Sequence, residues 1–222
     1  FTRVKVLRTC AVGESNVDRV IGNLMTESNP TVGLAAHIGQ TDVRITTKTD
    51  TEEEANQNIA RMEAVLRERL GIAIYGEGKE TVASVVGDLL AEKGLILGVI
   101  DTLTDGQLTR EMTENGHRER ILEIQPGESA GSPVVSAGSG EQVAEAMARQ
   151  AANETGLGLA MVGPFDDKTT YMAVYGPYDA LLIERSRNFQ DSDHIRRWLT
   201  TQGLDWVRRV LLGQLTSPAD FR

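Results

Sequence analysis

Hydroxyl and carboxylate side chains lie close together at residues 100–106, which read Ile-Asp-Thr-Leu-Thr-Asp-Gly. A threonine hydroxyl is a nucleophile only when a neighbouring base takes its proton. Asp101 directly precedes Thr102, and Lys168 and His117 are further candidate bases whose distances from Thr102 the sequence does not give. The candidate chemistry of this stretch is therefore nucleophilic attack by Thr102.

The same residues also suit a purely structural role. Thr102 and Asp105 have the types and spacing of the N-cap and N3 residues of a helix, which we expect over Leu103–Asn115. Such a cap contributes roughly 1 kcal/mol to helix stability. We favour this interpretation over catalysis by Thr102.

The element that positions these residues is the continuous apolar run Leu95–Ile100. A run of this kind is typical of a strand buried on both faces of a parallel sheet. The carboxyl end of such a strand, where it leads into a helix, is the usual ligand site of an open α/β sheet. The turn at Asp101–Gly106 is therefore where we expect any site to lie.

The first 76 residues predict a β-α-β-β-α-β order, the split βαβ plait. Hydrophobic periodicity and helix-capping patterns predict these elements: a strand within Thr2–Thr9 that ends near Leu7 and Arg8, a helix capped by Ser15 and Asp18, strands Thr31–Ala36 and Asp42–Lys48, a helix from the Thr51–Glu54 capping box to Gly71, and strand Ile72–Tyr75.

Gly76-Glu77-Gly78-Lys79 is the best boundary between two domains, because a near-neutral stretch precedes it and an acidic one follows. Beyond it the pattern predicts helix Glu80–Lys93, the strand and helix already described, strand Arg120–Gln125, a loop over Pro126–Gly140, helix Glu141–Asn153, strands Leu157–Val162, Thr170–Tyr175 and Ala180–Ser186, and helix Asp191–Leu212.

Composition limits the possible functions. The formal net charge of -9 argues against non-specific binding to nucleic acid or membrane surfaces. The single cysteine, Cys10, allows no intrachain disulfide, so a reducing, cytoplasmic setting is expected. No apolar run approaches the roughly 20 residues that span a bilayer. The chain begins with Phe1 and carries no signal peptide, so we expect a fragment of a longer protein. Its histidines are isolated, so we expect no metal site and no cofactor.

The first 76 residues resemble the middle, KH-like domain of the CinA (competence/damage-inducible protein A) family in LRTCAVGESNVDRVIGNL, NPTVGLAAHIGQTDVRIT and LGIAIYG. The remainder resembles the C-terminal domain of that family in VVGDLLAEKGLILGVI, AGSGEQVAEAMARQ and HIRRWLTTQGLDWVRRVL. The resemblance implies an α/β protein with a KH-like or ferredoxin-like plait over residues 1–76 and a three-layer α/β/α domain over 77–222. It also implies an amidohydrolase domain acting on nicotinamide mononucleotide, a preceding molybdopterin-binding-like domain, and a homo-oligomer.

The chain departs from the family at its catalytic motif, Ala-Glu-Ser-x-Thr-Gly-Gly. Asp101 keeps the acidic position, and Thr104 and Gly106 match, whereas Thr102 replaces the nucleophilic serine and Asp105 replaces the first glycine. By this resemblance the candidate catalytic residues are Thr102, Asp101 and Thr104, in a degenerate motif.

Other family positions are altered as well. The tyrosine and lysine that the family needs downstream are missing between Gly106 and Gly140. A Thr-Gly-x-Ala-Gly-Pro loop is reduced to residues 161–164, and of two expected arginines one falls on Ser192 and the other is Arg196. The candidate substrate-binding residues are Gly106, Gly163 and Arg196.

Three hypotheses follow. The leading one is a CinA-like fragment whose amidohydrolase-type domain is non-catalytic and serves assembly or regulation. The first alternative is an active amidohydrolase that binds a pyridine nucleotide and uses Thr102. The second is a nucleic-acid-binding KH-like module, which is disfavoured because the loop at Gly13-Glu14-Ser15 lacks a second glycine and carries an acid.

Overall fold

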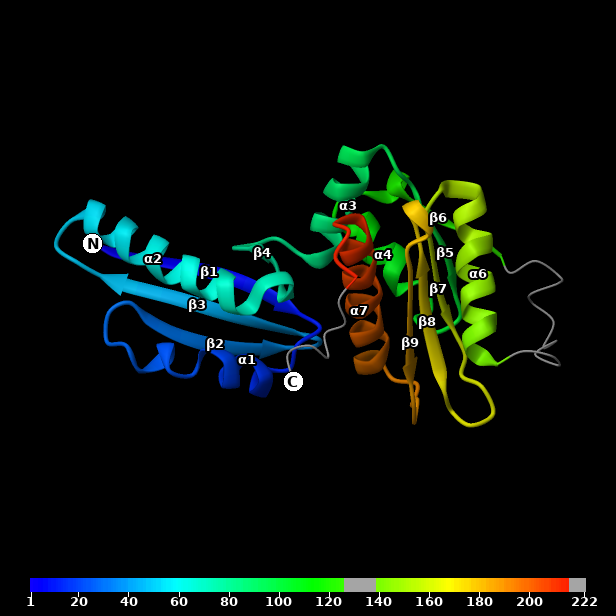
Figure 1. Ribbon diagram of the computed structural model, residues 1–222, viewed down its shortest axis with the longest axis horizontal. Helices are drawn as coiled ribbons and strands as arrows, with labels where there is room; N and C mark the ends of the chain where they lie inside the picture. Colours follow the sequence, from blue (N-terminus) through cyan, green and yellow to red (C-terminus); the bar gives the residue numbers. More distant parts are fainter. Residues whose placement is uncertain (126–138, 216–222) are drawn as a thin grey trace. The chain divides into compact units, whose positions relative to one another are not determined.

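The computed structural model describes residues 1–125 and 139–215, which divide into two compact units, Phe1–Thr81 and Val82–Leu215 (Figure 1). No helix of the described residues is long and apolar enough to cross a membrane. Each unit is an α/β structure with its own sheet.

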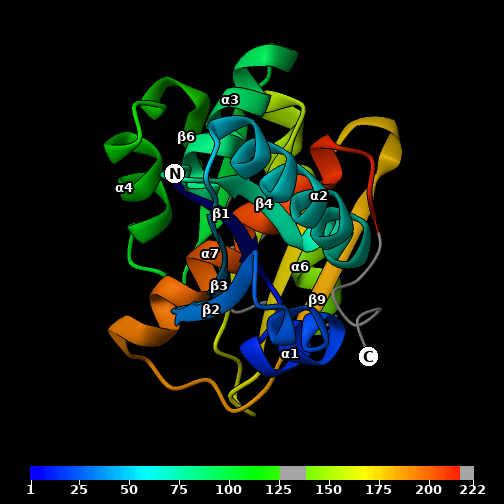
Figure 2. The ribbon, with the colours of Figure 1, turned by 90° about the vertical axis from the view of Figure 1, so that its left-hand side faces the viewer.

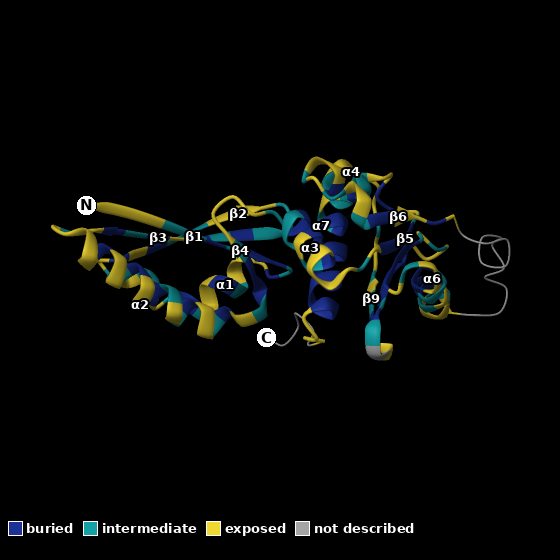
Figure 3. Ribbon diagram, turned by 90° about the horizontal axis from the view of Figure 1, so that it is seen from above, coloured by how far each residue is buried: buried dark blue, intermediate teal, exposed yellow. Residues whose placement is uncertain are grey.

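The first unit is the predicted plait. Its sheet has the order β2-β3-β1-β4 with every neighbouring pair antiparallel, as a split βαβ fold requires. Both helices lie on one face of that sheet (Figure 3), and they pack against each other (Figure 2). Its elements are β1 (Thr2–Cys10), α1 (Glu14–Ile21), η1 (Leu24–Thr26), β2 (Thr31–His37), β3 (Gln40–Lys48), α2 (Glu52–Leu70), η2 (Gly71–Ala73) and β4 (Ile74–Glu77).

Helix α2 shows why the sequence pattern succeeded here. The Thr51 hydroxyl accepts a hydrogen bond from the Glu54 N–H at 3.2 Å, as the predicted cap requires, and the helix ends at Gly71, whose φ is +49°. Its apolar stripe is buried against β1 and β3. The stripe consists of Ala55, Ile59, Met62, Leu66 and Leu70.

The predicted start of helix α1 is wrong. The N-cap is Gly13 rather than Ser15, and no side chain caps the helix. The Gly13 carbonyl accepts hydrogen bonds from the N–H groups of Asn16 and Val17, at 2.9 and 3.1 Å. The backbone therefore closes this first turn by itself, and Ser15 and Asp18 lie within the helix.

The second unit contains a five-stranded mixed sheet of order β6-β5-β7-β8-β9. Strand β5 is parallel to β6 and to β7, and the other pairs are antiparallel. Its elements are α3 (Val82–Lys93), β5 (Leu97–Asp101), α4 (Gln107–Glu114), η3 (Arg118–Arg120), β6 (Ile121–Glu123), α6 (Gly140–Thr155), β7 (Gly158–Val162), β8 (Thr170–Tyr175), η4 (Pro177–Asp179), β9 (Leu181–Ser186) and α7 (Asp193–Leu211).

Helices cover both faces of this sheet, in the predicted three layers. Figure 1 shows α6 on one side of the strands and α7, flanked by α3 and α4, on the other. Two strand glycines permit the close approach of α6. A Cβ at Gly158 would lie 2.0 Å from the Ala148 carbonyl oxygen, and one at Gly98 would lie 2.6 Å from that of Ala151. The parallel pairing of β5 with β7 brings their carboxyl ends to one edge of the sheet.

The helix after β5 begins later than predicted. Helix α4 starts at Gln107 instead of Leu103, because Gly106 adopts a left-handed conformation with φ +72° directly before it. Residues 102–106 are consequently a turn at the edge of the sheet. The predicted loop Pro126–Gly140 falls largely outside the described residues, although Ser139 forms a capping box with Gln142 at the start of α6.

Candidate functional site

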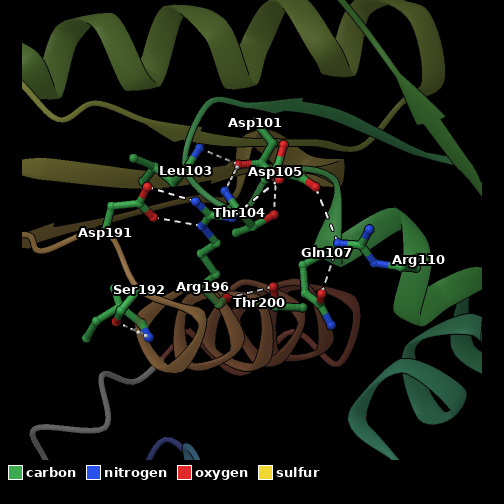
Figure 4. A network of polar contacts seen from close by, with 11 residues as sticks. Asp101, Leu103, Thr104, Asp105, Gln107, Arg110, Asp191, Ser192, Arg196 and Thr200 are labelled. Carbon is green, nitrogen blue, oxygen red and sulfur yellow. Dashed lines mark hydrogen bonds and ion pairs between the residues drawn. The ribbon is translucent and has the colours of Figure 1, made fainter.

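Asp101, the last residue of β5, holds the following turn together. Its Oδ1 accepts hydrogen bonds from the N–H groups of Leu103 and Thr104, at 2.8 and 3.0 Å. Its Oδ2 accepts a hydrogen bond from the Thr104 hydroxyl, which is fully buried (Figure 4). Both carboxylate oxygens and the Thr104 side chain are thus engaged in building the turn.

Thr102 joins the turn to the next strand of the sheet. Its N–H donates to the Met161 carbonyl at 2.9 Å. Its hydroxyl donates to the Gly163 carbonyl at 2.9 Å and accepts from the Gly163 N–H at 3.2 Å. The predicted N-cap pair is therefore wrong, because the Thr102 side chain points to the loop after β7 rather than to helix α4, whose N-cap is Gly106.

In the described chain, none of the three candidate bases is hydrogen-bonded to Thr102. In residues 1–125 and 139–215 the Thr102 hydroxyl has hydrogen bonds only with the backbone of Met161 and Gly163. The His117 imidazole packs against Gly87 and lies 3.5 Å from an oxygen of Asp88, on helix α3. No hydrogen bond or ion pair of the described chain involves the Lys168 side chain, and the Asp101 carboxylate is occupied as described above.

Arg196, in the first turn of α7, reaches the same edge of the sheet but is already paired. Its Nε and one terminal nitrogen contact the two oxygens of Asp191 at 2.7 and 2.8 Å, which is a bidentate pair. The other terminal nitrogen lies 3.3 Å from Asp105 Oδ2 (Figure 4). The guanidinium hydrogen bonds hold the pKa of Asp191 below its usual value. Asp191 therefore stays ionised and keeps Arg196 neutralised.

Asp105 has an unusual backbone conformation that explains part of this arrangement. Its φ is +55°, in the left-handed region that glycine adopts without strain and that aspartate tolerates better than most residues. The conformation is thus compatible with glycine or aspartate at this position. Aspartate adds a carboxylate, which pairs with Arg196.

A cavity of about 370 Å³ lies beside the turn, at the carboxyl ends of β5 and β6. Val99 and Ile124 supply apolar lining, while Asp101, Asp105 and Glu123 supply carboxylates. The remaining lining residues are Gly106, Thr109 and Gln125. Sequence reasoning missed Glu123 and Gln125, because only the parallel pairing of β6 with β5 brings them to this edge. The cavity favours neutral or cationic groups over phosphate.

The predicted site residues thus lie at one edge of the sheet, where three sets of contacts hold them. Asp101 and Thr104 build the turn, Thr102 is bonded to Gly163, and Arg196 is paired with Asp105. Gly106 ends the turn and lines the cavity. In the described part of the chain, no group of three or more His, Cys, Asp or Glu side chains could hold a metal ion.

Comparison with known proteins identifies the relatives of the chain. Residues 4–76 match the family model described as the damage-inducible protein CinA KH domain. The predicted relationship to the CinA family is confirmed. A CinA-like protein of Dictyoglomus thermophilum is 29% identical over 231 residues, covering 94% of this chain and 56% of that protein. A putative competence-damage inducible protein of Moorella thermoacetica is 30% identical over 177 residues, covering 72% and 42% respectively.

The chain spans a little over half the length of the first CinA-like relatives that it matches. Among solved structures, the competence/damage inducible protein CihA of Agrobacterium tumefaciens is similar to this chain, and the match covers 62% of this chain and 98% of the CihA chain. The TM-score of that match is 0.44 and the sequence identity is 13%.

Proposed function

We propose that the unit Val82–Leu215 is a CinA C-terminal-like domain that no longer hydrolyses nicotinamide mononucleotide and is retained for assembly or regulation. The resemblance of its sequence to the amidohydrolase domain supports the relationship. The contacts of Thr102 and Arg196 support the loss of chemistry.

The observation that carries this proposal is the hydrogen bonding of the Thr102 hydroxyl. A hydroxyl attacks an amide carbonyl when its proton passes to a base. Here the proton is directed to the Gly163 carbonyl oxygen, which is not a base at neutral pH, and the oxygen lone pair accepts from the Gly163 N–H. To attack, Thr102 would have to give up both bonds and find a proton acceptor elsewhere.

Electrostatics at the turn also disfavour a nucleotide phosphate. The three carboxylates of Asp101, Asp105 and Asp191 outnumber the two guanidinium groups of Arg196 and Arg110 at this turn, so the local formal charge is negative. Two unit charges 4 Å apart interact by about 1 kcal/mol in bulk water and by about 4 kcal/mol near a protein surface. Each carboxylate close to a bound phosphate therefore weakens binding by about fivefold or more.

An active amidohydrolase that uses Thr102 is the alternative from the enzyme class. The decisive experiment incubates the purified chain with nicotinamide mononucleotide and measures released ammonia. A CinA-family amidohydrolase with the intact serine motif serves as the positive control. We expect no release above the protein-free blank for the wild type and for Thr102→Ser. Release that disappears in Thr102→Ala would establish the alternative and overturn the proposal.

A nucleic-acid role for the first unit is less well supported. The loop before α1 carries Gly13 as the N-cap and Glu14 in the first turn, so an acidic side chain stands where a phosphate would approach. We expect no retention of RNA or single-stranded DNA even at low salt, where backbone contacts are strongest. Salt-dependent retention by the intact chain would restore this alternative.

An assembly role predicts that the chain self-associates. Gel filtration coupled to light scattering measures the mass directly, and we expect a homo-oligomer at micromolar concentration. The calculated mass of one chain is 24.2 kDa. A mass of one chain across the accessible concentration range would remove assembly and leave regulation as the proposed role.

A further inference from the structure

The first half of β1 has no neighbouring strand on the side of β4. Strand β4 pairs with β1 only over Leu7–Thr9. Gly78, with φ +61°, donates its N–H to the Val6 carbonyl at 2.9 Å and then turns the chain away. Figure 1 shows that β4 is much shorter than β1, and Figure 3 shows the beginning of β1 as exposed. In the described chain, Thr2–Lys5 pairs with β3 alone.

The backbone of Val4 offers a hydrogen-bond donor and acceptor at this free edge. Along a strand, alternate residues direct their N–H and C=O groups to the same neighbour. Because the Val6 carbonyl points towards the β4 side, the N–H and C=O of Val4 point to that side as well. A donor and an acceptor held at strand spacing match the backbone of another extended peptide. The exposed Val4 side chain, 43% accessible, would contact that peptide on the sheet face opposite α2.

A groove of about 700 Å³ runs beside this edge, between β1 and α2. Ile59 and the small Ala60 leave room on the α2 side of the strand. The groove is lined by Arg3, Val4, Lys5, Val6, Asn56, Ile59, Ala60, Glu63, Glu77, Gly78 and Glu80. Its long side is a strand edge, so it is open to an extended peptide rather than enclosed around a small ligand.

The charges on the α2 side of β1 specify which residues a partner strand can carry. Lys5 Nζ is held between Glu63 at 2.7 Å and Glu77 at 2.9 Å, so it has no need of a further anion. Arg3 has a single, loose contact with Glu52 at 3.5 Å, and these two side chains are 45% and 63% exposed. A carboxylate opposite Arg3 is therefore favoured, and an uncharged residue suits the position opposite Lys5.

The same charges disfavour pairing of two copies through this edge. An antiparallel pair centred on Val4 of both chains would place Arg3 of one copy opposite Lys5 of the other. Because Lys5 is already bonded to Glu63 and Glu77, this pairing would leave Arg3 without a carboxylate from the residue opposite it. The expected occupant is therefore a strand from a different protein.

We propose that the groove beside Thr2–Val6 binds an extended segment of another protein as an added antiparallel strand. Read from its N-terminus, the segment carries an uncharged, a β-branched and an acidic residue, opposite Lys5, Val4 and Arg3 in turn. The antiparallel direction matches both existing neighbours of β1. The inference concerns the first unit only and is independent of whether the second unit is catalytic.

The test uses the intact chain, labelled with nitrogen-15, and the capped peptide acetyl-Thr-Thr-Val-Glu-Thr-amide. We expect the amide signals of Val4 and its neighbours to shift on titration, and the Val4 N–H to exchange more slowly. Methylating the backbone nitrogen of the peptide valine removes its bond to the Val4 carbonyl. This change should weaken binding about tenfold, as one hydrogen bond of about 1.4 kcal/mol corresponds to a factor of ten.

A charge exchange provides the matched control. Replacing the peptide glutamate by lysine should weaken binding several-fold. The Arg3→Glu variant should restore binding of the lysine peptide and weaken binding of the original peptide. Strand β2 is the other free edge of this sheet, and its Leu34 amide serves as the internal reference. Shifts at Leu34 instead of Val4, binding indifferent to N-methylation, or no shift at millimolar peptide would each overturn the proposal.

Discussion

Replacement of Thr102 by valine or by serine separates a structural role of its hydroxyl from a catalytic one. Valine has nearly the same shape as threonine but lacks the hydroxyl, so it removes both hydrogen bonds to the Gly163 backbone. Serine keeps the hydroxyl and loses only a methyl group. If the hydroxyl connects the loops after β5 and β7, Thr102→Val should destabilise the protein and Thr102→Ser should not.

The magnitude follows from the number and exposure of these bonds. A hydrogen bond within a protein contributes about 0.5–1.5 kcal/mol net to stability. The two bonds to Gly163 and a longer one of 3.4 Å to the Met161 carbonyl are lost, but Thr102 is exposed, so water can replace part of them. We therefore expect Thr102→Val to lower the free energy of unfolding by about 1 kcal/mol, the lower end of the range for two hydrogen bonds. Thr102→Ser should change it by less than about 0.5 kcal/mol. For a domain of this size, 1 kcal/mol corresponds to a fall in Tm of about 2–4 °C.

Tryptophan fluorescence during urea unfolding measures the stability of the second unit, which contains Thr102. The chain has two tryptophans, Trp198 and Trp206, and both lie in α7 of the second unit. The urea midpoint should fall for Thr102→Val with an unchanged slope, which indicates altered stability without altered exposed surface. A valine variant as stable as the wild type, or a serine variant destabilised as much as valine, would refute the structural role.

Three further predictions concern packing, pH dependence and charge. Gly158→Ala should destabilise the second unit by about 3 kcal/mol or more in the same urea assay, because its Cβ would overlap the Ala148 carbonyl of α6. Burial raises the pKa of Glu184, because the charged form is poorly solvated in the folded protein. The folded protein therefore loses stability as pH rises from about 4.5 through the raised pKa. Glu184→Gln should therefore raise Tm relative to the wild type more at pH 8 than at pH 4, and an equal effect at both would contradict this. Asp105→Gly should strengthen phosphate binding near Arg196 several-fold in an NMR titration, since it removes one carboxylate without changing a left-handed backbone. Unchanged affinity would show that Asp105 does not exclude anions.

The fold was largely predictable because it depends on local patterns. The apolar stripe and cap of α2 lie within consecutive turns of one helix, so the sequence contains all of their determinants. The β-α-β-β-α-β order then restricts the sheet to few topologies. The start of α1 was mispredicted because Gly13 supplies a backbone turn where the sequence offered the more familiar Ser15 cap.

The candidate site was less predictable because its contacts join distant segments. Residues 101–106 were correctly expected to lie at the edge of the sheet. The partner of Thr102 lies 61 residues further along the chain, and that of Asp105 lies 91 residues away. The spacing of Thr102 from Asp105 is the same whether the Thr102 side chain caps a helix or bonds to the loop after a neighbouring strand. Only tertiary pairing of β5 with β7 and β6 decides between them.

If the second unit has lost hydrolysis as we propose, changing one residue of the turn to the family's type should not restore it, because Thr102 and Asp105 each have a stabilising partner. Thr102→Ser would leave a hydroxyl that still donates to the Gly163 carbonyl and, among the described residues, is hydrogen-bonded to no base. Removing the Asp105 carboxylate would leave Arg196 in its bidentate pair with Asp191. Meanwhile Gly98 and Gly158 preserve the close packing of α6 on the sheet, which requires no catalytic residue. The physical requirements for this fold and for amide hydrolysis are thus separable, and the described residues of the second unit meet those of the fold.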